Sequence, residues 1–295
     1  MKFAKYQGLG NDFVVVDLRG IDSASAAAMQ DPQVAQTVCD RQFGIGADGV
    51  LAILPAQGSD ARMRVLNADG SEAEMCGNGL RCVVEALAAT GSSKSELAIE
   101  TGAGRLLCTR RSDGVTVAMG RPMLTRGEIP MTGPPSERCV DQLLELPGES
   151  PLRITGVSMG NPHVVLFDDS AGDLRTLAET IGPRIETHAW FPRRTNVEVV
   201  RVRSRREFDV VVWERGVGIT LACGTGACAT VVAAILNDRC DEASDVRVNL
   251  LGGPLQIRVE AGLGNVFMHG PAVRVFEGEF DPRALARRPI AFAAS

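Results

Sequence analysis

The stretch Met75–Gly79 reads Met-Cys-Gly-Asn-Gly, and Ala222–Gly226 reads Ala-Cys-Gly-Thr-Gly. Each follows a turn-rich segment and precedes an apolar run with helical spacing, so each cysteine is predicted to lie where a helix begins. The two copies lie about half the length of the 295-residue chain apart. One thiol at an equivalent position in each half predicts a site in which two thiols face each other across a shared cleft.

Other landmarks recur at nearly the same offset. Gly10–Val15 (Gly-Asn-Asp-Phe-Val-Val) reappears as Gly160–Val165 (Gly-Asn-Pro-His-Val-Val), and Met119–Pro122 is answered by Met268–Pro271. Three matches in the same order indicate an internal duplication with two similar domains. The predicted halves are residues 1–121 and 122–272, each of ordinary domain size.

Composition excludes several classes of function. The net charge is only −5, without a long run of one sign, which argues against nucleic-acid and membrane-surface partners. The N-terminus lacks the apolar core of a signal peptide, and no apolar run is long enough to span a bilayer. Eight cysteines without a secretion signal predict reduced thiols. The three histidines do not stand at zinc-finger spacing from cysteines, so no metal site is expected.

The element pattern is α+β rather than a regular alternation of strands and helices. A helix is predicted over Pro32–Arg41 with Asp31 as its cap. Further helices are predicted from Gly79 to just before Gly91 and over Leu174–Ile181. Most remaining apolar segments are predicted strands, including 14–16, 50–54, 63–66, 97–100, 105–109, 115–119, 164–167, 195–202, 208–213, 246–250, 255–259 and 266–268.

The residues around each cysteine favour acid–base chemistry. A free thiol has a pKa of about 8.5, and a helix N-terminus stabilises its thiolate. The glycines after each cysteine allow a ligand close to the backbone, where N–H groups could hold a carboxylate. A single Cys-Gly-x-Gly would be interpreted as a buried cysteine beside a turn, but two equivalent copies favour function. A nucleophilic thiol enzyme would leave the second cysteine unexplained.

Two cofactor alternatives are disfavoured. Gly44–Gly49 reads Gly-Ile-Gly-Ala-Asp-Gly, but it follows a predicted helix and precedes a strand, the reverse of a dinucleotide-binding motif. A pyridoxal phosphate enzyme needs a lysine for its Schiff base. The chain offers only Lys2, Lys5 and Lys94, two near the N-terminus and one in a Gly-Ser-Ser loop. A route without cofactor is therefore expected.

At this point the sequence resembles the diaminopimelate epimerase family. The matching motifs are Gly8–Phe13, Asn67–Ser71, Met75–Cys82, Gly160–His163, Glu214–Gly216 and Ala222–Cys228. Together they are highly specific and cover nearly the whole chain. The resemblance implies two pseudo-symmetric domains, each a curled, mainly antiparallel sheet around a central helix. A strand from about residue 273 to 283 is expected to return to the first half, and no role is assigned to residues 284–295.

The resemblance implies that L,L- and meso-diaminopimelate are interconverted without metal or pyridoxal phosphate. One cysteine acts as thiolate base and the other as thiol acid, and these fall on Cys76 and Cys223. Their roles swap with the direction of reaction. The substrate contacts implied are Asn11, Asn67, Gly77, Asn78, Asn161, Asn196, Glu214, Arg215, Gly224 and Thr225. His163 and Glu214 are candidates for assisting proton transfer.

These residue types suit such a substrate. Asn side chains both donate and accept hydrogen bonds, and Arg215 suits bidentate capture of a distal carboxylate. Three positions depart from the family pattern: Gly49, where some members have Gln, and Ile219 and Leu221, where polar residues are common. A racemase of another amino acid on the same fold and a non-catalytic amino-acid-binding protein stay open as alternatives.

The resemblance is compatible with a homodimer, although no motif in the sequence demonstrates one. With diaminopimelate as substrate, it places the protein in lysine biosynthesis in the cytoplasm. Oxidation could join the two sulfurs if they approach to disulfide distance.

Overall fold

The structure, a computed structural model, describes residues 1–282. The chain divides into two compact units. Unit 1 combines Met1–Val115 with the segment that starts at Pro271, and unit 2 is Thr116–Gly270. Among the described residues, no helix is both long and apolar enough to cross a membrane.

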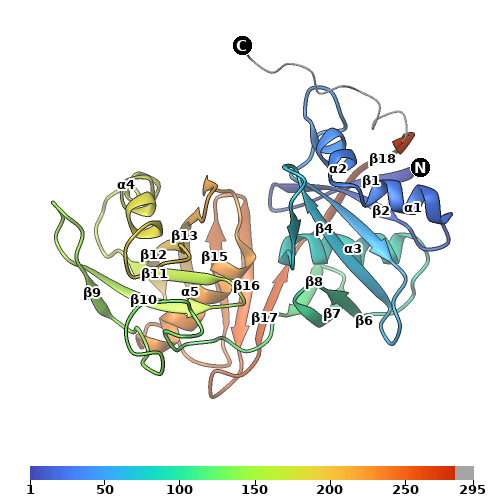
Figure 1. The fold of residues 1–295 in the computed structure, drawn as a ribbon. Helices are drawn as coiled ribbons and strands as arrows, with labels where there is room; N and C mark the ends of the chain where they lie inside the picture. The colour runs from blue at the N-terminus through green and yellow to red at the C-terminus, as the bar shows by residue number, and fades with distance from the viewer. Residues whose placement is uncertain (283–295) are drawn as a thin grey trace, which may run out of the picture. The chain divides into compact units, whose positions relative to one another are not determined.

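Unit 1 is a sheet with helices on both of its faces (Figure 1). Its elements are β1 (Lys2–Gly8), β2 (Asn11–Asp17), α1 (Ser23–Met29), α2 (Pro32–Cys39), β3 (Gly49–Leu54), β4 (Ala61–Asn67), β5 (Glu72–Ala73), α3 (Gly77–Ala89), β6 (Glu96–Thr101), β7 (Gly104–Arg111) and β18 (Val273–Glu279). The pairing runs β18–β1–β2–β3–β4–β6–β7. The pairs β2–β3 and β4–β6 are parallel and the others antiparallel.

Unit 2 repeats this plan. β8 (Gly114–Ala118) leads into it, and its further elements are β9 (Gln142–Leu144), β10 (Leu152–Ser158), β11 (Pro162–Phe167), α4 (Leu174–Glu186), β12 (Asn196–Ser204), β13 (Glu207–Glu214), β14 (Gly218–Ile219), α5 (Gly224–Leu236), β15 (Asp245–Leu250), β16 (Gly253–Val259) and β17 (Val266–Gly270). The order is β9–β10–β11–β12–β13–β15–β16–β17, with β11–β12 and β13–β15 parallel. The predicted α+β class and duplication are confirmed.

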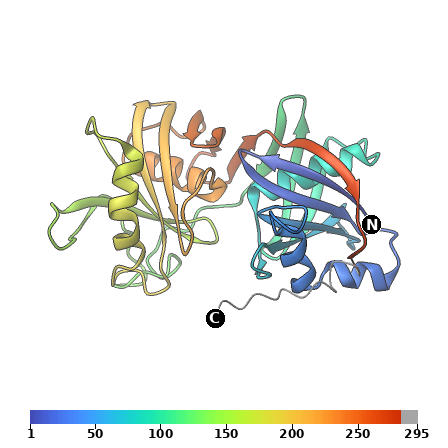
Figure 2. The ribbon, with the colours of Figure 1, turned by 90° about the horizontal axis from the view of Figure 1, so that it is seen from above.

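Each sheet packs helices on both of its faces, because its strands are apolar on both sides. Val14 and Val16 of β2 are buried against α2, whereas Leu51 of β3 contacts the start of α3. In unit 2, Val197 and Val199 of β12 are buried against α4. Figure 2 shows α4, in yellow-green, alongside the yellow strands of unit 2, where it contacts β12 and β13. Each fully buried valine stabilises the fold by about 1.5–3 kcal/mol.

The predicted helix ends differ from the structure at one instructive place. The predicted helix ends at Ile181, but α4 continues to Glu186 with Pro183 inside. The reason lies in tertiary packing. A Cβ on Gly182 would lie 2.6 Å from Cγ of Trp213, so glycine here lets the helix pack closely on β13. α1, an alanine-rich segment without a clear apolar stripe, was not predicted.

Candidate functional site

Cys76 occupies the N-cap of α3. Its extended backbone (φ −138°, ψ 110°) ends the preceding turn, and its sulfur accepts a hydrogen bond from the N–H of Gly79 at 3.4 Å. The side-chain oxygen of Asn11 lies 3.9 Å from this sulfur, and Nδ2 of Asn78 lies 3.4 Å from the same oxygen. The structure therefore brings three of the predicted site residues together at the start of α3.

Two further hydrogen bonds fix the side chains of Asn11 and Asn67 in unit 1. Nδ2 of Asn11 donates to the carboxylate of Asp48 at 2.7 Å, which fixes the amide with its oxygen toward the thiol. Asn67 stands opposite Gly49 at the end of β4, and its amide donates to the hydroxyl of Ser71 at 2.9 Å. Asp48 was not singled out from the sequence.

Cys223 occupies the N-cap of α5 in the same way. Its backbone is extended (φ −113°, ψ 108°), and its sulfur accepts from the N–H of Gly226 at 3.4 Å. The hydroxyl of Thr225 lies 3.5 Å from the sulfur, and Nδ2 of Asn161 donates to that hydroxyl at 3.3 Å. Asn161 and Thr225 stand at the positions of Asn11 and Asn78, but here the hydroxyl of Thr225, and not the asparagine oxygen, lies beside the sulfur. Gly77 and Gly224, the first residues of the two helices, are both buried.

The surroundings of Cys223 favour the protonated thiol. Burial raises the pKa of this thiol well above its ordinary value, and the nearby carboxylates of Glu214 and Glu198 raise it further. The hydrogen bonds from Thr225 and Gly226 act in the opposite direction but do not outweigh burial. A helix N-terminus alone was expected to favour the thiolate, so at this position desolvation reverses the simple expectation.

Glu214 is the second acid close to Cys223. Burial raises the pKa of its carboxyl, and the Thr220 hydroxyl, which donates to it at 2.6 Å, lowers that pKa in part. The shift therefore favours the protonated carboxylic acid.

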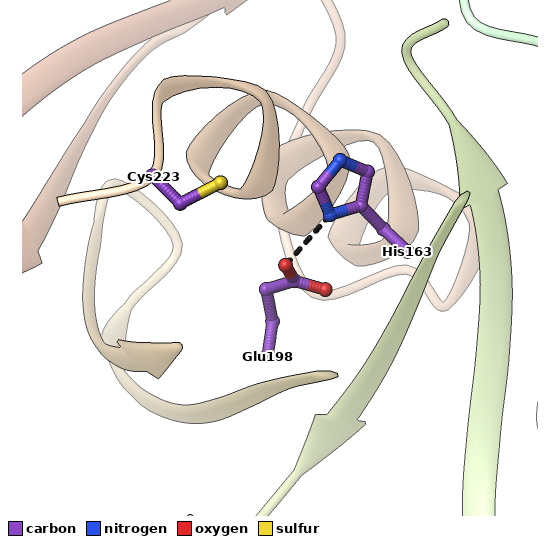
Figure 3. Close-up of side chains that lie close together, drawn as sticks. All are labelled: His163, Glu198 and Cys223. Atoms are coloured by element: carbon purple, nitrogen blue, oxygen red, sulfur yellow. Dashed lines mark hydrogen bonds and ion pairs between the residues drawn. The ribbon is translucent and has the colours of Figure 1, made fainter. Parts of the chain in front are cut away.

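His163 and Glu198 form a buried pair beside the sulfur of Cys223. Nδ1 of His163 lies 2.7 Å from a carboxylate oxygen of Glu198, and neither side chain is exposed. Figure 3 shows the sulfur pointing toward the imidazole, with the carboxylate below it. One donor atom of each residue lies within 4.8 Å of the other two, so the set has the chemistry of a transition-metal site. In the structure, Nδ1 and the carboxylate bind each other.

Asn196 and Arg215 are linked through the backbone. The side-chain oxygen of Asn196 accepts from the N–H of Arg215 at 2.8 Å, and its Nδ2 donates to the carbonyl of Pro162 at 3.0 Å. The guanidinium of Arg215 donates to the carbonyl of Arg193 at 3.1 Å. Asn196 is buried and joins β11 to the turn after β13, so it fixes the position from which Arg215 extends.

Glu198 is the main residue of this site that sequence reasoning missed. It lies within Asn196–Val200, which reads Asn-Val-Glu-Val-Val, where a lone acid in a buried apolar strand is a signal of a paired group. Of the departures from the family pattern, Ile219 packs on the core beside α4, and Leu221 is 51% exposed. Neither contributes a side-chain hydrogen bond near the thiol.

Comparison with known proteins places this geometry in a family. The family model described as diaminopimelate epimerase matches residues 3–125 and 155–275. A diaminopimelate epimerase of Synechococcus elongatus is 49% identical over 286 residues, covering 95% of this chain and 98% of that protein. The diaminopimelate epimerase of another Synechococcus strain is 48% identical over 284 residues, covering 94% and 97%.

The fold also recurs at low identity. The structure of a hydroxyproline epimerase from Agrobacterium vitis superposes with a TM-score of 0.67 at 16% identity, covering 94% of this chain and 90% of that one. At this identity the likeness shows the fold alone. The family match over both halves and the high identity along nearly the whole length show that this chain belongs to the diaminopimelate epimerase family.

Proposed function

We propose that the protein interconverts L,L- and meso-diaminopimelate by proton transfer between two thiols at one α-carbon. Family membership makes it an isomerase, and specifically an epimerase. The observation that carries the mechanism is the repeated cap. Cys76 and Cys223 each start a helix, and each sulfur accepts an N–H bond at 3.4 Å from the residue three positions on. A two-base inversion needs two equivalent thiols, and one unit supplies each.

In this proposal the thiolate of one cysteine takes the α-proton, and the thiol of the other returns a proton to the opposite face. The S–H bond of the base forms as the C–H bond breaks, and the reverse exchange occurs at the acid. Burial favours the thiol form of Cys223, which is the form that can act as the acid, and the roles of the two cysteines swap with the direction of reaction. A substrate of the opposite configuration then requires the complementary state, in which Cys223 is the thiolate and Cys76 is the thiol.

The proposed substrate contacts are polar groups from both halves of the sequence. The N–H groups at the starts of α3 and α5, which include Gly77 and Gly224, bind the reacting carboxylate. Arg215 binds the distal carboxylate bidentately. The polar contacts proposed around the amino-acid groups are Asn11, Asn67, Asn78, Asn161, Asn196, Glu214 and Thr225.

Solvent exchange and mutation test this proposal. In heavy water, active enzyme should place deuterium on the inverted carbon of L,L-diaminopimelate, and inversion without deuterium would refute the two-base scheme. Cys76→Ala and Cys223→Ala should each lose nearly all epimerisation. Cys108→Ala, which alters a buried cysteine of β7, is the matched control. Inversion of a different amino acid, but not of diaminopimelate, would favour the racemase alternative.

We also propose that the reaction needs no metal or pyridoxal phosphate. All three lysines form ion pairs with carboxylates: Lys2 with Glu279, Lys5 with Asp12 and Lys94 with Asp60. Dialysis against a chelator should leave the activity unchanged, and restoration of lost activity by a metal or by pyridoxal phosphate would contradict this.

A homodimer in the cytoplasm, serving lysine biosynthesis, completes the proposal. β18 supports the dimer, because this edge strand exposes Val273, Val275 and Phe276. Light scattering should give twice the chain mass, and Phe276→Glu should shift the protein toward monomer. A wild-type monomer at all concentrations would exclude the dimer. Cell fractionation tests the compartment.

A further inference from the structure

The last residue of α4 is a buried acid. Glu186 is only 5% exposed and stands at a helix C-terminus, where the partial negative charge of the helix disfavours a carboxylate. Burial alone would raise the pKa of its carboxyl, but hydrogen bonds from Trp213, Gly216 and Arg194 hold that pKa below its ordinary value. Glu186 is therefore ionised at neutral pH, at a place where helix stability alone would not favour an acid.

Both carboxylate oxygens of Glu186 accept N–H donors. Oε2 accepts from Nε1 of Trp213 at 2.8 Å. Oε1 accepts from the backbone N–H of Gly216 at 2.9 Å and from Nη1 of Arg194 at 3.3 Å. One oxygen thus joins two loops, the segment before β12 and the turn after β13. Such bonds are stronger than those between neutral groups, because the acceptor is charged.

The turn after β13 carries Arg215, and Glu186 holds this turn at the next residue. The N–H of Val217 donates to the carbonyl of Glu214 at 3.0 Å, which closes the turn. Gly216 has φ +75°, the conformation that a type II turn requires at its third position. Its bond to Glu186 therefore fixes the backbone directly beside Arg215.

The loop before β12 holds the other end of Arg215. The guanidinium of Arg215 donates to the carbonyl of Arg193 at 3.1 Å. The next residue, Arg194, has a left-handed backbone (φ +57°), and its side chain binds Oε1 of Glu186. The carboxylate therefore constrains both the backbone beside Arg215 and the loop whose carbonyl binds its guanidinium.

Unit 1 shows that such a turn can be held without an acid. β4 and β13 hold the same place in the two sheets, and the turn after β4 is Asn67–Gly70. There the amide of Gln36 from α2 donates to the carbonyl of Asp69 at 2.6 Å. A neutral side chain thus holds a turn without a basic residue. Unit 2 buries a carboxylate beneath a turn that carries Arg215, which indicates a role tied to that arginine.

We propose that Glu186 is a positioning residue that fixes Arg215 for the distal carboxylate of the substrate and thereby favours dicarboxylic amino acids. This rests on the proposed role of Arg215. An arginine on a loosely held turn would lose much conformational freedom when it binds a carboxylate. Because Arg215 is already held at its backbone and at its guanidinium, it loses less, and the substrate binds more tightly. Glu186 acts on binding and not on the proton transfers.

Glu186→Gln tests this with almost no change in shape. Both oxygens of Glu186 face N–H donors, so a glutamine must turn its NH2 group toward one of them. KM for diaminopimelate should rise about tenfold, the scale of one lost hydrogen bond to a charged group, while kcat changes by less than about twofold. Glu179→Gln, which breaks an exposed pair with Arg175 in the same helix, is the matched control and should leave both unchanged.

A double-mutant cycle with Arg215→Ala separates positioning from general damage. Arg215→Ala alone should raise KM, and adding Glu186→Gln should then lower kcat/KM no further. A wild-type KM in Glu186→Gln overturns the proposal. So does an equal loss of kcat/KM from Glu186→Gln with and without Arg215, because a structural effect does not depend on that side chain.

Arg194→Asn guards against misfolding. The side chain of Arg194 is 59% exposed, and asparagine tolerates a left-handed backbone. If Glu186→Gln does not fold, this variant takes the same test: KM should rise with Arg215 present and not in Arg215→Ala, and a wild-type KM overturns the proposal. A wild-type KM in Arg215→Ala alone would instead refute the role of Arg215 in the proposed function, so the two failures are distinct.

Discussion

The side-chain oxygen of Asn196 accepts the backbone N–H of Arg215 at 2.8 Å, so a buried amide holds the residue proposed to bind the distal carboxylate. In the proposed site, this amide would act on the substrate through the backbone of Arg215 even without a direct contact. Binding of the far end of the substrate then depends on a residue inside the sheet.

Asn196→Ala should therefore weaken substrate binding more than it slows the chemical step. We expect KM for diaminopimelate to rise about tenfold and the free energy of unfolding to fall by about 1–3 kcal/mol, since the N–H of Arg215 loses its partner. Steady-state kinetics and chemical denaturation measure both. Asn249→Ala removes a half-buried amide that binds Glu207 and Asp209 in the same sheet, and it should leave KM unchanged. An unaltered KM in Asn196→Ala would contradict this role.

Gly226→Ala should damage the enzyme more than Gly79→Ala. The added methyl group meets the Glu198 carboxylate at 2.6 Å and the Cys223 sulfur at 3.3 Å, whereas at Gly79 it meets a leucine methyl at 3.0 Å. To make room, Glu198 must shift from His163, and overpacking of this kind costs about 1–3 kcal/mol. Thermal unfolding and kcat of both variants test this, and equal kcat values would count against it.

Asp12 should make the stability of unit 1 sensitive to acid. Burial alone would raise the pKa of its carboxyl, but hydrogen bonds from Arg41 and Lys5 lower it from 3.8 to about 2. A folded-state pKa below the unfolded value means that ionised Asp12 stabilises the fold above about pH 4. This contribution is lost as the pH falls from 3.8 toward 2.

At pH 7, Asp12→Asn should lower the free energy of unfolding by about 3 kcal/mol, because Lys5 is buried and loses its counter-ion. The difference from wild type should narrow as the pH falls below 4. Asp17→Asn, which breaks the more exposed pair with Arg19, should cost less than about 1 kcal/mol. A difference between wild type and Asp12→Asn that stays constant from pH 7 to pH 2 would exclude the linkage.

The two cysteines should differ in reactivity toward iodoacetamide at pH 7. Cys76 is half-buried, but Cys223 is only 5% exposed and its thiol pKa is raised by burial. Since the thiolate is the reactive form, peptide mapping should find Cys76 modified first. The buried Cys82 serves as an internal reference, with burial that raises its pKa to about 12, and it should stay unmodified longest. Faster labelling of Cys223 than of Cys76 would contradict the burial argument.

The sequence predicted the fold where local patterns and tertiary packing agree. The repeated Cys-Gly-x-Gly predicted both helix starts, and Asp31 with Pro32 predicted the start of α2. The sequence did not predict structure that depends on packing between residues far apart in the chain. An example is the end of α4 near Gly182, which packs on Trp213. Glu198 was missed for the same reason. Its partner His163 stands 35 positions earlier, and only the parallel pairing of β11 with β12 brings them together.

The return of β18 to β1 sets an order for biogenesis. During synthesis, all residues of unit 2 are made before the strand Val273–Glu279 that pairs with Lys2–Gly8. Unit 2 can therefore complete its sheet while the edge of unit 1 at β1 is still unpaired. Until translation passes Glu279, a nascent chain exposes that edge, and this is the interval in which a chaperone would protect it.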